Sequence, residues 1–186
     1  MKLVTPFALL ASVLLSACAN PINRVTSDNY AETCSIAEDN GKLEVAEQAC
    51  YRALVNVDLG NLGPELKSQR LYNLGRIKQR LGKFSEAELL FKESLQIEEK
   101  LTGPSEIKIG RRLVTISVAL AGQDKWSEGV PYLERVLPIA DQFSGQERAH
   151  TAEILTQYSK HLRKSNETAI AERFETKAMA LRGNKT

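Results

Sequence analysis

A short motif that recurs every 41 or 42 residues is the feature of this 186-residue chain that most constrains its fold. Each copy begins with a glycine, aspartate or asparagine, and a small residue follows five positions later. In the first three copies a bulky residue lies between them. The copies are residues 41–47, 82–88, 124–129 and 166–171. A fixed period of this length predicts structural units that stack in a row, because one unit cannot bury its apolar face alone.

The apolar residues around these copies follow the spacing of an α-helix. After the second copy begins, Phe84, Ala87, Phe91 and Leu95 recur three or four positions apart. Helix-like segments precede and follow each copy, and no long stretch alternates with a period of two. With 42% hydrophobic residues, the chain is also too apolar for the disordered class. We therefore expect a single all-α domain built from helical hairpins.

The second unit resembles the tetratricopeptide repeat (TPR), and this resemblance rests on seven positions: Leu71, Leu74, Gly75, Gly82, Ala87, Phe91 and Ser94. The 42-residue spacing and the loop at residues 101–104 resemble the longer repeats of kinesin light chains. The resemblance implies a right-handed superhelix, an α-solenoid of about four hairpins. They are expected at residues 27–60, 68–101, 110–143 and 152–182, with a tail at 183–186. Because Pro131 and Pro138 fall in the second helix of the third hairpin, we expect that helix to kink or end early.

Residues 1–17 have the pattern of a secretory signal peptide. Lys2 precedes an apolar run from Leu3 to Leu15 that is too short for a permanent membrane span. The next residues, Leu15-Ser16-Ala17-Cys18, resemble the lipobox of bacterial lipoproteins. That resemblance implies that Cys18 becomes the first residue of the mature chain and carries a diacylglyceryl group and an N-acyl chain such as palmitate. The alternative is a soluble secreted protein cleaved near Ala19.

The lipobox has consequences for location. Residues 18–26 would form a short tether that keeps the domain close to the membrane. Ala19 follows the lipidated position, and in enterobacterial sorting a residue other than aspartate there directs the protein to the outer membrane. We therefore expect a lipid-anchored protein of the bacterial cell envelope that faces the periplasm.

The other two cysteines are Cys34 and Cys50. Export places them in an oxidising compartment, which leaves a disulfide or two small buried thiols as the alternatives. They cannot form a zinc site alone, because such a site needs four ligands. The TPR register puts Cys34 on the first helix of the first hairpin and Cys50 on the second helix, facing back. The resemblance therefore implies a disulfide that joins the two helices.

The first helices of TPR hairpins line a concave groove that holds partner segments. Carried over by register, the resemblance implies a partner-binding groove that is basic in its middle and far end. In the family, an asparagine at the position of Asn73 hydrogen-bonds the backbone of an extended peptide. The groove residues implied in this way are Gln69, Tyr72, Asn73, Arg76, Gln79, Arg80, Arg111, Lys160, Arg163 and Lys164.

No recognisable catalytic pattern accompanies the repeat. The sequence has two histidines, His150 and His161, too far apart for one metal ion, and no phosphate-binding or hydrolase motif. Its net charge of +2 gives no electrostatic reason for nucleic-acid binding. We therefore expect a scaffold or assembly factor without catalytic residues, cofactor or metal, which binds a protein partner of an envelope machine. The alternative is a structural lipoprotein that self-associates, as a homodimer for example, through its uncapped last helix.

Overall fold

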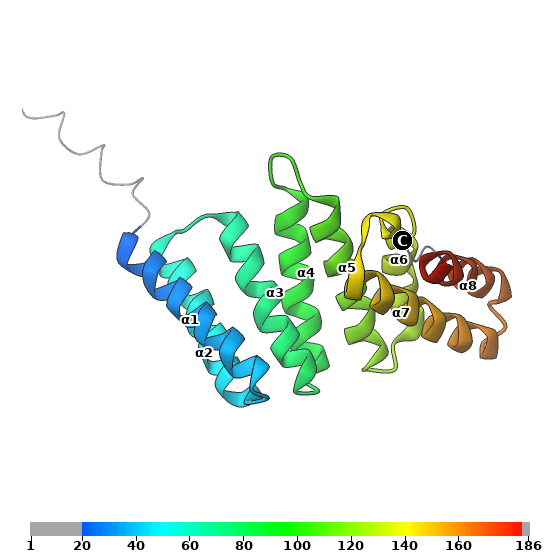
Figure 1. Cartoon of the computed structure of the whole chain (residues 1–186), viewed down its shortest axis with the longest axis horizontal. Coiled ribbons are helices and arrows are strands. Elements are labelled where there is room, and N and C mark those ends of the chain that lie inside the picture. Colours follow the sequence, from blue (N-terminus) through cyan, green and yellow to red (C-terminus); the bar gives the residue numbers. More distant parts are fainter. Residues whose placement is uncertain (1–19, 184–186) are drawn as a thin grey trace, which may run out of the picture.

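The computed structural model describes residues 20–183, and this part of the chain contains eight α-helices, one short 3₁₀ helix and no strand (Figure 1). The expected signal peptide at 1–17, the lipidation site Cys18 and most of the expected tail lie outside the described residues. The helices are α1 (Pro21–Asp39), α2 (Leu43–Gly60), α3 (Pro64–Arg80), α4 (Phe84–Glu99), α5 (Glu106–Ala121), α6 (Trp126–Val136), α7 (Gly145–Lys164) and α8 (Thr168–Gly183). None of them is long and apolar enough to cross a bilayer.

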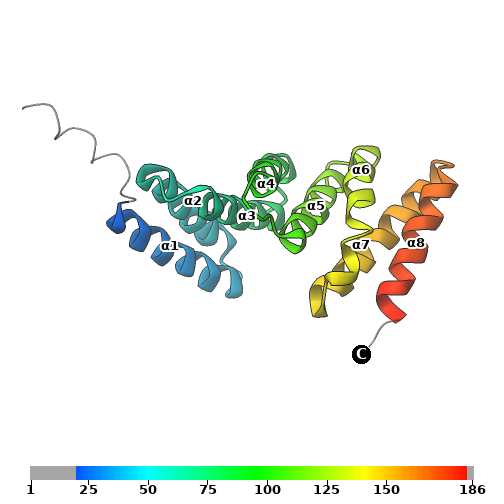
Figure 2. The same ribbon diagram turned by 90° about the horizontal axis from the view of Figure 1, so that it is seen from above.

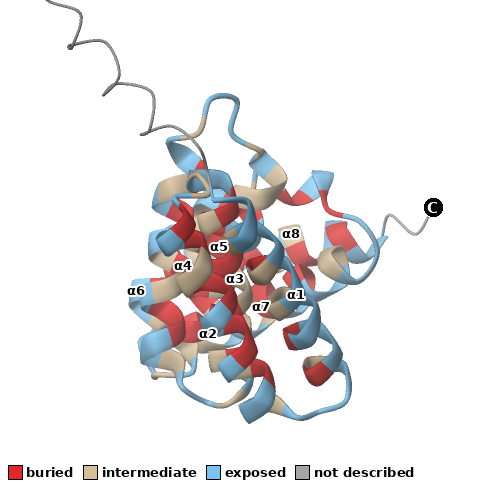
Figure 3. Ribbon diagram, turned by 90° about the vertical axis from the view of Figure 1, so that its left-hand side faces the viewer, coloured by how far each residue is buried: buried red, intermediate tan, exposed pale blue. Residues whose placement is uncertain are grey.

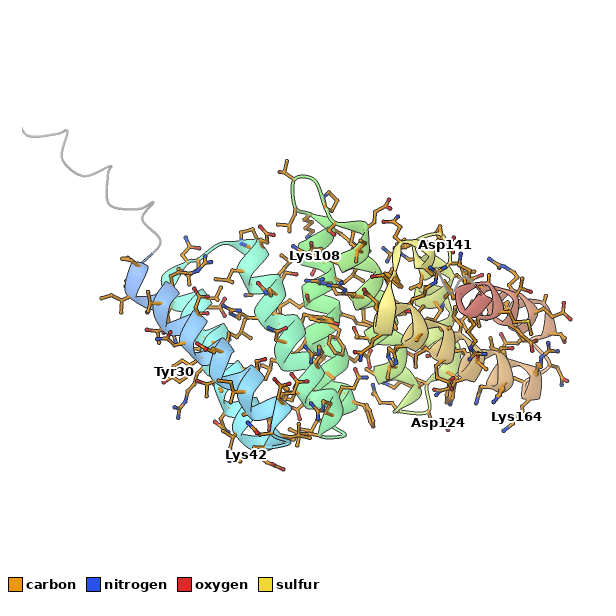
Figure 4. All side chains as sticks on the ribbon, in the orientation of Figure 1. Tyr30, Lys42, Lys108, Asp124, Asp141 and Lys164 are labelled. Atoms are coloured by element: carbon orange, nitrogen blue, oxygen red, sulfur yellow. A yellow bond between two sulfur atoms is a disulfide. The ribbon has the colours of Figure 1, made fainter. Side chains whose placement is uncertain are left out.

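The helices pair in sequence order as four hairpins that follow one another along the long axis of the molecule (Figure 1). Seen from above, the odd-numbered helices of the first three hairpins lie toward one side and their even-numbered partners toward the other (Figure 2). The turns inside the hairpins, marked by Lys42, Asp124 and Lys164, lie along one edge (Figure 4). The connections between hairpins, marked by Lys108 and Asp141, lie along the opposite edge. The predicted all-α solenoid of four hairpins is confirmed.

The first residue of each repeated motif shapes the turn inside a hairpin. Gly41, Gly82, Asp124 and Asn166 all adopt positive φ, at 69°, 74°, 60° and 62°. Glycine reaches this left-handed region without strain, and aspartate and asparagine tolerate it better than other residues. The motif therefore recurs because each hairpin needs one left-handed residue to reverse the chain.

The small residue of each motif sits where two helices approach closely. Ala46, Ala87 and Ala171 are fully buried, and Gly129 is buried at the matching position of α6. Buried positions run through the middle of the stack, with exposed positions on the outer faces of the helices (Figure 3). Each hairpin thus buries one face inside itself and another against its neighbours, as stacked repeats require.

All four hairpins begin earlier than the sequence predicted, at residues 21, 64, 106 and 145 rather than 27, 68, 110 and 152, and the first corrects the expected tether. α1 begins at Pro21, so residues 21–26 are helix rather than tether. Asn20 caps it, since its Oδ1 accepts a hydrogen bond from the backbone N–H of Ile22. The second and third hairpins likewise begin at Pro64 and Glu106. In α1 and α3 a proline at the first helical position favours a helix start, which the predicted boundaries left out.

The third hairpin departs from the others as its prolines predicted. α6 ends at Val136 after 11 residues, and a 3₁₀ helix (Ala140–Gln142) follows. Pro138 cannot donate a backbone hydrogen bond, and its ring clashes with the carbonyl one turn earlier in a continuing helix. The expected early end of this helix is therefore confirmed.

A disulfide joins the two helices of the first hairpin. Cys34 on α1 and Cys50 on α2 are bonded, with their Cα atoms 5.2 Å apart, and both side chains are buried. The predicted pairing is confirmed.

Two buried arginines hold consecutive hairpins together. Arg112 of the third hairpin donates to Ser94 Oγ (2.7 Å) and Ser68 Oγ (2.9 Å) of the second and lies 3.1 Å from a carboxylate oxygen of Glu98. Arg70, one repeat earlier, donates to Ser27 Oγ (3.2 Å) of the first hairpin. These contacts lie between hairpins, so they hold the superhelical arrangement on which any groove depends.

Candidate protein-binding groove

Three adjoining cavities lie along the odd-numbered helices, with volumes of about 510, 340 and 240 Å³. Tyr72 and Arg76 of α3 line all three cavities. The other lining residues include Glu38 of α1, Arg111 and Thr115 of α5, and His150 of α7. We call this set of cavities the groove. Its walls come from the first helix of every hairpin.

Tyr72 forms an apolar surface near the centre of the groove. Its ring lies 5.7 Å from the ring of Phe91, and the guanidinium of Arg112 lies 5.3 Å from its centre. Burial raises the pKa of Tyr72, which keeps the hydroxyl protonated at neutral pH. The side chain is therefore held in place on its inner side while its outer side lines the cavities.

The arginines of the groove are paired with carboxylates from neighbouring hairpins. Arg76 and Arg80 share Glu38 of α1, at 2.5 and 3.0 Å. Arg111 makes two hydrogen bonds to Glu147 of α7, at 2.6 and 3.0 Å, and these bonds raise the pKa of the arginine. The expected basic middle of the groove is thus largely neutralised, since these glutamates also line it.

Three amide side chains are among the polar groups of the groove that have an unpaired atom. Among the described residues, the side chains of Gln69 and Asn73 take part in no hydrogen bond. The Oε1 atom of Gln79 is the one buried side-chain nitrogen or oxygen in residues 20–183 that lacks a partner. A buried acceptor without a partner costs free energy, so this atom favours a ligand that donates a hydrogen bond.

Seven of the ten groove residues expected from the sequence line these cavities: Gln69, Tyr72, Asn73, Arg76, Gln79, Arg80 and Arg111. The remaining three, Lys160, Arg163 and Lys164, are exposed on the last turns of α7, outside the cavities. Arg163 pairs with Glu175 of α8 instead. The far end of the groove therefore lacks the basic character expected for it.

Sequence reasoning missed the residues that the fourth hairpin contributes. They are Gln146, Glu147, His150 and Thr151. The predicted repeat began at residue 152, whereas α7 begins at Gly145. A signal was present, because Ser144 followed three residues later by Glu147 matches the sequence pattern of a helix start.

The last helix offers little apolar surface for self-association. Phe174 and Leu181 are buried against the rest of the fourth hairpin, and Met179 is the one large apolar side chain exposed on α8. Within the described residues, no group of three or more histidine, cysteine or acidic side chains is placed to hold a metal ion.

A family comparison decides the identity of the second hairpin. Residues 69–105 match the model of the family described as "Tetratricopeptide repeat". This segment is a tetratricopeptide repeat. It covers α4 and most of α3, which supply the central wall of the groove and the Phe91 that supports Tyr72. The TPR resemblance inferred from the residues of this unit is confirmed.

Solved structures with the same fold extend the likeness to the whole stack. BtubC (BKLC) from P. vanneervenii superposes with a TM-score of 0.73 at 18% identity, over 87% of this chain and 65% of the other. The chain thus spans less than two thirds of that protein. The nearly identical TPR-like repeats of a Podosopora anserina "putative kinesin light chain" superpose with a TM-score of 0.64 at 16% identity, over 86% of this chain and 77% of the other. No curated protein sequence matches the chain. At these identities the likeness establishes the fold, a TPR solenoid of the kinesin-light-chain type.

Proposed function

We propose that this TPR protein is a membrane-anchored scaffold of the bacterial cell envelope that binds a segment of a partner protein in its groove. TPR folds serve as protein-protein interaction scaffolds and are typically not catalytic. The observation that carries the proposal is the continuity of the groove: Tyr72 and Arg76 line three adjoining cavities that reach from α1 to α7. Such a surface suits an elongated ligand better than a compact one.

The chemistry of the groove favours recognition of an extended backbone. The amides of Gln69, Asn73 and Gln79 can donate to and accept from main-chain groups of a bound segment. Tyr72 is half-buried and provides an apolar contact, and aromatic residues are frequent anchors in interfaces. Because the arginines already pair with glutamates, a strongly acidic segment gains less from this groove than its arginine content suggests.

Anchoring through Cys18 is the second part of the proposal. It rests on the lipobox-like residues 15–18 and is supported by the disulfide of the first hairpin, which suits an oxidising compartment such as the periplasm. An outer-membrane anchor facing the periplasm would let the groove serve an envelope assembly machine as an assembly factor.

Photo-cross-linking in living cells tests the groove. A photoreactive residue is placed at Gln69 or at His150, which are exposed on α3 and α7 within the groove. Leu89 of α4 is the control, because it is 69% exposed and lines none of the groove cavities. We expect one and the same partner protein from both groove positions and none from Leu89. Equal capture from all three positions, or capture from Leu89 alone, would contradict the proposal.

A further inference from the structure

Exposed apolar side chains gather on the first hairpin. Eight large apolar residues are exposed within residues 20–183, and six of them belong to α1 and α2. These six are Ile22, Val25, Ile36, Val45, Tyr51 and Leu59. Single exposed apolar residues are normal on protein surfaces, but a concentration on one element marks a contact surface.

Three of the six lie at one end of this hairpin. Ile22 and Val25 are three residues apart near the start of α1, so they share a face of the helix. Leu59 lies on the last turn of α2. The two helix ends meet, because the backbone N–H of Asn20 donates to the carbonyl of Gly60 at 3.3 Å. We call Ile22, Val25 and Leu59 the basal patch.

Close packing holds the helix ends of the basal patch together. A Cβ atom on Gly60 would lie 2.7 Å from Cβ of Asn23, so a residue without a side chain is needed where α2 passes α1. Ile22 and Leu59 are 73% and 72% exposed, and Val25 is 59% exposed. The patch is thus a fixed apolar surface at the edge of the molecule where the chain leaves toward residue 18.

The charges around the basal patch are mutually paired. Asp28 pairs with Arg24 (3.0 Å) and Arg70 (2.5 Å), and Asp58 pairs with Lys67 (3.1 Å). Neutralised carboxylates reduce the repulsion that an anionic lipid surface would otherwise exert on this end of the hairpin.

We propose that the basal patch rests in the interfacial region of the lipid bilayer, beside the acyl chains on Cys18. This inference rests on the anchoring part of the proposed function. Cys18 is two residues before Asn20, so a fully extended chain separates the two residues by about 7 Å at most. With Cys18 held in the membrane at most about 7 Å from Asn20, the bilayer surface lies next to Ile22 and Val25 and leaves little room there for a protein partner.

The contact gives the anchored protein a defined orientation. Acyl chains alone leave a domain free to turn about its tether, whereas an apolar patch beside them adds a second point of attachment. The hairpins follow one another along the long axis from α1 to α8, so α8 lies at the end remote from the patch (Figure 1). The groove runs from α1 to α7, so it would extend away from the end of the molecule that contacts the membrane.

Fluorescence quenching in vesicles tests this orientation with matched positions. Full-length protein is produced as the lipoprotein, and cysteine replaces Ile22 or Leu59 in the patch. Leu89→Cys and Met179→Cys are the controls, since these positions are 69% and 59% exposed on other hairpins. Acylation occupies Cys18 and the disulfide occupies Cys34 and Cys50, so the introduced thiol takes the environment-sensitive fluorophore. The vesicles contain phosphatidylethanolamine and phosphatidylglycerol, with or without lipids that carry a nitroxide near the headgroup.

We expect the nitroxide to quench the fluorophore at 22 and 59 about threefold more than at 89 and 179, because only the patch reaches the interface. Equal quenching at all four positions on an acylated protein would overturn the inference and leave the anchor intact. Intact-mass analysis of the same samples reports the acylation of Cys18. A protein without acyl chains would overturn the anchor, and with it this inference.

Discussion

Gly129 of α6 lies directly beneath the hydroxyl of Tyr158 on α7, so a Cβ atom at position 129 would fall 1.9 Å from the phenolic oxygen. That hydroxyl donates to the backbone carbonyl of Ser117 on α5 at 2.7 Å. Burial raises the pKa of Tyr158, which keeps it protonated as the donor. One tyrosine thus joins the third and fourth hairpins and requires a glycine where the other hairpins have alanine.

Replacing Gly129 by alanine is therefore expected to destabilise the protein. Overpacking of a buried contact costs about 1–3 kcal/mol, which exceeds the gain of up to about 1 kcal/mol in helix propensity. Urea unfolding followed by circular dichroism measures the free energy of unfolding. Gly183→Ala is the control, because no neighbouring atom lies within 4 Å of a Cβ at that position. A Gly129→Ala protein as stable as the wild type would show that Tyr158 can move aside.

The buried pair of Arg112 and Glu98 gives a second prediction. Both side chains are buried, and their atoms approach to 3.1 Å. Arg112→Ala leaves the carboxylate of Glu98 without its buried partner, which costs about 3–5 kcal/mol when such a pair is broken. The matched surface variant Arg135→Ala breaks a half-exposed pair with Glu99 and is expected to cost less than about 1 kcal/mol. Similar unfolding midpoints for the two variants would contradict this difference.

The third prediction is that the contact of Glu47 with Lys78 and Lys83, between the first two hairpins, makes the free energy of unfolding sensitive to acid. Hydrogen bonds from Lys78 and Lys83 hold the pKa of Glu47 below its ordinary value of 4.5. A lowered pKa in the folded state stabilises the fold above pH 4.5, and this contribution is lost as the pH falls below 4.5.

Glu47→Gln removes that contribution. We expect the free energy of unfolding to fall less between about pH 7 and pH 3.5 in this variant than in the wild type. Glu65→Gln makes the same change of charge at an exposed position and is the control. An equal loss of stability on acidification in all three proteins would contradict the assignment to Glu47.

Local chemistry explains how much of the fold could be predicted from the sequence. Gly41, Gly82, Asp124 and Asn166 mark the turns because a left-handed residue is required there, and that requirement is visible in the residue types. The early end of α6 follows in the same way from Pro138, whose effect is local. The cysteine pair was predictable only through the TPR register, which places both residues on facing helices.

The groove was only partly predictable because it depends on how hairpins rotate relative to one another. Counting two repeats of 42 residues from Arg76 leads to Lys160, so the sequence argument assigned both residues the same place in the groove. This assignment assumes that successive hairpins are related by translation alone. In the structure the first turns of α7 approach the groove, and Arg111 meets Glu147, 36 residues later. The pair Lys83 and Glu47 shows the same separation. Contacts between hairpins set this rotation, so a pattern within one repeat cannot reveal it.

The disulfide supplies the last prediction, which concerns the hairpin that carries the basal patch. Closing a loop of about 15 residues stabilises a fold by about 3 kcal/mol in the chain-entropy model. Cys34→Ser with Cys50→Ser should lower the free energy of unfolding by an amount of that order. Because hairpins in a solenoid contact mainly their neighbours, the loss should concentrate in α1 and α2. Hydrogen exchange should therefore become faster in those helices while α7 and α8 keep their protection.

Reductant separates the effect of the bond from the effect of the substitutions. The wild type unfolded with dithiothreitol should match the double-serine variant, and the variant itself should not respond to dithiothreitol. Faster exchange spread evenly over all four hairpins would contradict a local effect, and would mean that the disulfide acts on the cooperativity of the whole stack. Concentrated loss would instead show that the first hairpin depends on its own disulfide for stability while the other hairpins do not.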